Sequence, residues 1–197
     1  MTSVLLTPAR DALVVGRRAL LSGGGKATLS AVAVALIAGC ESMAASSSTG
    51  DPADDVAILN TALGLEHEAI AAYQVGAESG LLTPGVLKVA VGFQSDHKSH
   101  AEVLSSTIVK LGGTPAAMMA VADYQFPVDQ LKSEADVLRF AAGLEQGAAS
   151  AYLGAVPVFA NRDLAQAAAS IMGAEAQHWS ILLSALGENP VPGAFIA

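Results

Sequence analysis

An internal repeat constrains the fold of this chain more than any other feature of its sequence. The segment LEHEAIAAY at residues 65–73 matches LEQGAASAY at 144–152 in its leucine, its glutamate, two alanines and its tyrosine. At nearly the same displacement, DHKSHAEVL at 96–104 matches AEAQHWSIL at 174–182 in a histidine and a leucine. The sequence therefore predicts two copies of one helical hairpin.

The hydrophobic period shows where the helices of each hairpin should lie. Apolar residues recur at intervals of three and four, which is the period of an α-helix that buries one face. Ser133 and Asn161 can cap helices, whereas Pro157 should end or kink one. The expected helices cover residues 51–79, about 85–111, about 133 to the proline at 157, and about 161–186.

The connections between these helices indicate the topology. Only a few residues join the first helix to the second and the third to the fourth, so each pair should form an antiparallel hairpin. The segment GGTPAAMMAVADYQFPVDQLK at 112–132 is long enough to run the full length of a bundle. The sequence thus predicts an all-α domain at 54–187, a four-helix bundle of two hairpins joined by one long crossover, with a tail at 188–197.

Ionisable side chains interrupt the apolar stripe of every expected helix. The first and third helices each carry one glutamate on the stripe, and the other two each carry two ligand-capable side chains three positions apart. Burying an unpaired polar group costs about 1–3 kcal/mol, and a metal ion is one way to compensate it. Residues three apart share a helix face, so each pair can bind one ion or two adjacent ions. The candidate metal ligands are Glu66, His97, His100, Glu145, Glu175 and His178.

Three other side chains lie close to these positions. Tyr73 and Tyr152 follow the lone glutamates by two turns on the same face, so we expect core residues with satisfied hydroxyls. His67 lies beside Glu66 but off the stripe, and we expect it at the surface or just outside the site.

The pattern as a whole resembles the di-iron and di-manganese carboxylate proteins of the ferritin-like superfamily. These proteins take a glutamate from each of two helices and a Glu-x-x-His motif from each of the other two. In detail the chain is similar to bacterial ferritin-like domain proteins that carry a twin-arginine leader. The resemblance implies a ferritin-like four-helix bundle with two metal ions, iron or else manganese. With iron, the resemblance implies ferrous oxidation or reaction with dioxygen or peroxide. With manganese, it implies a catalase-like enzyme. A non-catalytic stress or structural bundle of the cell envelope stays open as a third function.

One position departs from the family pattern. Where the second helix should carry a glutamate, this chain has His97, which makes the motif His-x-x-His. Either His97 is itself a ligand, or the neighbouring Asp96 replaces the carboxylate. The regular stripe of residues 93, 97, 100 and 104 favours His97. A histidine in place of a carboxylate removes one negative charge and should disfavour the most oxidised metal states.

The first 40 residues have the features of an export signal. Arg17 and Arg18 precede an apolar stretch at 27–38 that is too short for a mature membrane helix, which needs about 20 residues. The segment GRRALL resembles a twin-arginine translocation motif. We therefore expect a protein exported to the periplasm or cell envelope.

Cys40, the single cysteine of the chain, ends a segment that resembles a lipoprotein lipobox. Lipidation there would anchor the protein to the membrane, with residues 41–53 as a flexible spacer. The alternative is ordinary cleavage after small residues at 42–45, which would discard Cys40.

The charge of the chain limits its partners. Its formal net charge is −8, and nucleic-acid binding needs a basic face, so we expect no nucleic-acid partner. The expected partners are metal ions, with dioxygen or peroxide as possible substrates. Association of identical subunits, as iron storage would require, stays open.

Overall fold

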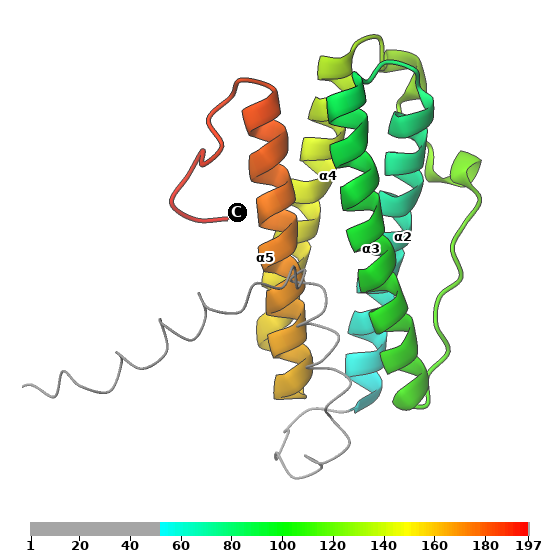
Figure 1. Cartoon of the computed structure of the whole chain (residues 1–197). Coiled ribbons are helices and arrows are strands. Elements are labelled where there is room, and N and C mark those ends of the chain that lie inside the picture. The colour runs from blue at the N-terminus through cyan, green and yellow to red at the C-terminus, as the bar shows by residue number, and fades with distance from the viewer. Residues whose placement is uncertain (1–51, 197) are drawn as a thin grey trace, which may run out of the picture.

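The computed structural model describes residues 52–196, and the described part folds into four long α-helices without a strand (Figure 1). This confirms the predicted all-α bundle. The long helices are α2 (Pro52–Glu78), α3 (Pro84–Lys110), α4 (Glu134–Ala155) and α5 (Arg162–Ala185). Short 3₁₀ helices cover Val121–Tyr124, Val128–Gln130 and Val156–Val158. The expected export signal, Cys40 and nearly all of the expected spacer lie outside the described residues.

Local side-chain contacts explain where α4 and α5 begin. Ser133 accepts a hydrogen bond from the backbone N–H of Asp136, and Asn161 accepts from those of Asp163 and Leu164. Such N-caps satisfy donors that have no partner within the helix. The structure therefore confirms both predicted caps.

The helices pair as two antiparallel hairpins. α2 packs chiefly against α3, and α4 packs chiefly against α5. The segment between α3 and α4 runs along the outside of the first hairpin from one end of the bundle to the other (Figure 1). Asn60 holds the start of this crossover, because its side chain donates to the carbonyl of Thr114 and accepts from the N–H of Ala116. The predicted long crossover is thus present.

A buried carboxylate fixes the connection between α4 and α5. Asp55 is 3% exposed, and its two oxygens accept hydrogen bonds from the backbone N–H groups of Ala160 and Asn161, at 2.7 and 3.0 Å. These bonds attach the second hairpin to the first turn of α2. They compensate the burial of a charge that would otherwise be costly.

Most of the apolar core lies in two parts, one toward each end of the bundle. The cluster nearer the α4–α5 connection includes Leu59, Leu63, Leu104, Ile108 and Ile171. The cluster nearer the α2–α3 connection includes Tyr73, Phe93, Leu138, Leu182 and Leu183. The candidate ligands occupy the level between these clusters, so apolar layers shield them from water on both sides. Among the described residues, no helix has both the length and the apolar character needed to cross a membrane.

Candidate metal centre

The bundle brings all six candidate ligands to one buried place. Each helix presents them on its inward face, and none of the six residues is more than 5% exposed. The contributions are Glu66 from α2, His97 and His100 from α3, Glu145 from α4, and Glu175 and His178 from α5. Burial of three carboxyl groups and three imidazoles together requires mutual compensation or a bound cation.

The six side chains divide into two overlapping groups of four. In each group, one possible ligand atom from every residue lies within 4.8 Å of the others. The first group is Glu66, His97, His100 and Glu175; the second is His97, Glu145, Glu175 and His178. His97 and Glu175 belong to both groups, so the arrangement has the form of two adjacent sites with shared residues.

His97 lies at the middle of this arrangement. Its Nδ1 is 2.8 Å from Oε2 of Glu66, and its Nε2 is 3.2 Å from Oε1 of Glu145. It therefore contacts one carboxylate from each hairpin. The sequence left His97 and Asp96 as alternative ligands. The structure places His97 in both groups.

Asp96 lies at the edge of the centre instead. Its side chain is 37% exposed, and its Oδ2 is 3.3 Å from Nε2 of His178. The other nitrogen of that imidazole, Nδ1, faces Glu145 and Glu175 at 3.4 and 3.3 Å. A carboxylate on the outer nitrogen of a histidine fixes the ring and its tautomer, which is common behind metal-binding histidines. Sequence analysis did not assign this supporting position to Asp96.

The two tyrosines of the repeat bond to the lone glutamates across the hairpins. The hydroxyl of Tyr73 on α2 donates to Oε1 of Glu145 on α4. Reciprocally, the hydroxyl of Tyr152 on α4 donates to Oε1 of Glu66 on α2, at 2.6 Å. Both hydroxyls are satisfied, as predicted. Each glutamate thereby has one oxygen held by a tyrosine.

Several buried ligand atoms in the centre make no hydrogen bond of good geometry, although some lie within ion-pair distance of one another, such as Nδ1 of His100 at 3.0 Å from Oε1 of Glu175. They are Nδ1 of His100, Oε2 of Glu145, both carboxylate oxygens of Glu175 and Nδ1 of His178. Buried polar atoms in folded proteins are nearly always hydrogen-bonded, so such a concentration requires an explanation. Imidazole nitrogens and carboxylate oxygens together suit iron, manganese and zinc. The donor set therefore fits metal ions.

The charges of the centre shift the pKa of its members strongly. Burial raises the pKa of Glu66, but His100 and His97 more than reverse this and bring it to about 2. Burial lowers the pKa of His100, but Glu175 and Glu66 raise it to about 9. The pKa of His178 also reaches about 9, because Glu145 and Glu175 outweigh its burial. Imidazolium groups thus balance the carboxylates, and a metal ion would have to displace their protons.

His67 lies outside both groups, as the sequence indicated. It is half-buried next to Glu66 in the chain, and its Nδ1 has no hydrogen-bond partner. Burial lowers its pKa, while the negative charge of Glu66 acts in the opposite direction. The structure therefore gives it no ligand position.

A hollow between α2 and α4 leads from the surface to the centre. It has a volume of about 190 Å³ and reaches His97 and Glu145. Gly143 and Gly147 on α4 form part of its wall, and a Cβ at either position would meet open space. Glu68 also lines it. The absence of side chains at the two glycines leaves this hollow open beside His97 and Glu145.

Comparison with known proteins agrees with this geometry. The family model described as "Ferritin-like domain" matches residues 54–188. A crystal structure of a conserved hypothetical protein, rv2844, from Mycobacterium tuberculosis is similar with a TM-score of 0.63 and 26% sequence identity, over 74% of this chain and 99% of that chain. No curated protein matches the sequence.

Proposed function

Because the chain belongs to the ferritin-like domain family, we propose that its six buried glutamate and histidine side chains hold two metal ions, with iron as the resident metal. The observation that carries this proposal is the pair of overlapping four-residue groups, each with a complete set of oxygen and nitrogen donors. Iron bound there would supply redox chemistry toward dioxygen or peroxide, such as ferrous oxidation or removal of oxidants.

The protein's own residues would position and protect this centre. Tyr73 and Tyr152 each hold one oxygen of a lone glutamate. In Glu145 this is Oε1, which also faces His97 and His178, whereas Oε2 has no hydrogen-bond partner. Asp96 supports the ring of His178 from outside. The two apolar clusters exclude water from both ends. Such fixed supporting contacts are needed for a defined ligand geometry.

The location of the protein in the cell is a further part of the proposal. Arg17, Arg18 and the apolar stretch at 27–38 support export, and the lipobox-like segment ending at Cys40 supports a membrane anchor. An exported redox centre would act in the cell envelope. Folding before export, which a twin-arginine route permits, would let the metals bind in the cytoplasm.

Two other functions fit the same fold. A manganese catalase-like enzyme would use a similar set of ligands, and a stress or structural bundle would need no turnover. The burial of the six residues does not distinguish these functions, because a buried centre is compatible with each of the three.

Elemental analysis of the protein purified from its exporting host distinguishes the three functions. Iron near two per chain, together with oxygen consumption by the reduced protein, supports the proposal. Manganese with peroxide dismutation supports the catalase-like alternative. Protein that carries no metal and binds none from ferrous or manganous solutions supports the structural alternative. Glu175→Gln is the matched variant, because Glu175 belongs to both groups and its loss should deplete both ions.

A further inference from the structure

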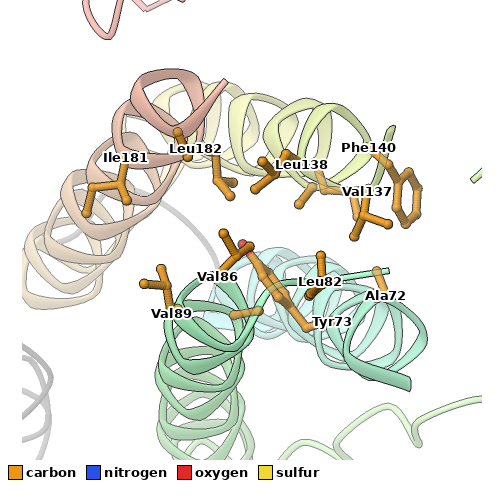
Figure 2. Close-up of a pocket in the computed structure, with 16 residues that line it drawn as sticks. Ala72, Tyr73, Leu82, Val86, Val89, Val137, Leu138, Phe140, Ile181 and Leu182 are labelled. Atoms are coloured by element: carbon orange, nitrogen blue, oxygen red, sulfur yellow. The ribbon is translucent and has the colours of Figure 1, made fainter. Parts of the chain in front are cut away.

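An apolar cavity lies between the two hairpins at the end of the bundle where α2 connects to α3. Its volume is about 140 Å³, and all four helices line it (Figure 2). Figure 2 shows Leu138 and Leu182 of the second hairpin facing Val86 and Tyr73 of the first across the space. Tyr73 carries the single polar side chain of the lining.

The cavity is larger than the voids that close-packed interiors hold. Protein interiors are packed as densely as organic crystals and hold few voids larger than a water molecule. A dry cavity of roughly 150 Å³ with aliphatic and aromatic walls can hold a benzene molecule or a xenon atom. The cavity described here has that size and that chemistry. It has no partner for a charged or strongly polar guest, which would be excluded by its desolvation cost.

The cavity reaches the surface between α3 and α5. Val89 and Ile181 belong to its lining and are 40% and 47% exposed. Figure 2 shows these two side chains on the side where α3 faces α5. A molecule can therefore enter from solvent between two aliphatic side chains.

The inner wall of the cavity is also the outer wall of the candidate metal centre. The ring of Tyr73 lines the cavity, while its hydroxyl donates to Glu145. Phe93 meets Tyr73 edge to face with ring centroids 6.2 Å apart, and it stacks on His178 at 4.0 Å. Tyr73 therefore contacts both the cavity and the centre, and Phe93 packs between its ring and His178.

We propose that this cavity binds a small uncharged apolar molecule and delivers it to the centre past Tyr73, and that dioxygen is the molecule it takes. Dioxygen is apolar and smaller than benzene, so it fits a space that excludes ions. The choice of dioxygen rests on the proposed function of the centre. The hollow between α2 and α4, which includes Glu68 and reaches His97, would serve polar species such as metal ions and peroxide.

Xenon tests the cavity without any metal, because it is an inert apolar atom that occupies such spaces. The full chain is titrated with xenon and followed by ¹²⁹Xe NMR, or its crystals are pressurised with xenon. Saturable binding beside Tyr73 and Leu138 is expected. Ala141→Leu, which adds bulk to the lining, should abolish it. Ala169→Leu changes a half-buried alanine on α5 that does not line the cavity, and should leave binding intact.

Ala90→Leu is a second filling variant, from the opposite wall on α3. If Ala141→Leu does not fold, Ala90→Leu should abolish xenon binding in its place. Absence of saturable xenon binding in the unaltered protein would overturn the proposal. Equal binding in a folded filling variant would do the same, because the xenon would then lie elsewhere.

Dioxygen delivery is tested with protein loaded anaerobically with ferrous iron and then mixed with dioxygen or with hydrogen peroxide. Ala141→Leu, or Ala90→Leu in its place, should slow the oxidation of ferrous iron by dioxygen by roughly an order of magnitude. It should leave the oxidation by hydrogen peroxide unchanged. Unchanged rates with dioxygen would overturn the delivery of dioxygen through the cavity. Failure of the protein to bind iron would count against the proposed function, whereas the xenon measurement would still decide whether the cavity takes an apolar guest.

Discussion

Nδ1 of His97 lies 2.8 Å from Oε2 of Glu66, so the histidine that replaces a glutamate in the repeat faces the lone glutamate of its own hairpin. Its second nitrogen is 3.2 Å from Glu145 of the other hairpin. The replacement therefore changes the charge at the middle of the centre.

Substitution of His97 should change the number of bound metal ions. The closest carboxylate contact of His97 is with Glu66, so we expect His97→Ala to lose or weaken the ion on that side and to leave the site of Glu175 and His178 better occupied. His97→Glu should keep two ions and lower the redox potential, because it adds a negative charge. The measurement is metal stoichiometry, with electrochemistry for the glutamate variant.

Asp96→Ala is the matched control for that series. Asp96 contacts the outer nitrogen of His178, so its removal should keep the stoichiometry and weaken affinity by roughly tenfold. If Asp96→Ala empties the site while His97→Ala leaves it full, Asp96 is the ligand.

The tyrosine–glutamate bonds should contribute measurably to stability. Tyr152→Phe leaves Oε1 of Glu66 without its donor, and Tyr73→Phe leaves Oε1 of Glu145 with His97 alone. Each substitution should lower the free energy of unfolding by about 1–3 kcal/mol. Urea unfolding of the metal-free variants measures this loss. Tyr124→Phe, in the crossover, should cost less. Losses no larger than that of Tyr124→Phe would show that the two buried bonds contribute little.

Stability of the metal-free protein should fall as pH rises. The pKa of His100 and of His178 is raised from 6.5 to about 9 by neighbouring glutamates, against the effect of burial. Their protonation stabilises the fold fully below pH 6.5, and this contribution is lost as pH rises through about 9. We expect a loss of up to about 3 kcal/mol for each histidine across this window.

Urea unfolding at several pH values measures that dependence. His67→Gln should keep it, because His67 lies outside both groups. Metal affinity should rise over the same pH window, since metal and protons compete for the same nitrogens. A metal-free protein that becomes more stable as pH rises would mean that these histidines are neutral in the folded state.

Much of the fold was predictable because its determinants are local. The caps of α4 and α5 lie within three residues of the groups they bind, and the crossover could be inferred from its length alone. The hydrophobic stripes also indicated which faces of the helices turn inward. The inward position of the six candidate ligands follows from the same periodicity.

Other features depend on how the two hairpins pack and have no local signal. The repeat placed each tyrosine two turns after a glutamate, but the hydroxyl bonds the glutamate of the other hairpin, as in Tyr152 with Glu66. Likewise, the contact of Asp96 with His178 joins α3 to α5. The apolar cavity arises where the side chains of four helices leave space, which no single stripe reveals.

The cellular location of the protein can be tested separately from its metal centre. Replacing Arg17 and Arg18 with lysines should block export, and Cys40→Ser should move the mature protein from the membrane fraction to the soluble fraction. Cell fractionation and immunoblotting measure both. A serine variant that stays with the membrane would point to another anchor or to an uncleaved leader.

Anomalous diffraction at the iron edge, from crystals of the iron-loaded protein, tests the central claim most directly. We predict two anomalous peaks per chain, one among Glu66, His100 and Glu175 and the other among Glu145, Glu175 and His178, with His97 beside both. In Glu175→Gln crystals both peaks should weaken. Iron found only at surface carboxylates, or no peak between the two hairpins in fully loaded crystals, would contradict the assignment of these six residues to a metal centre.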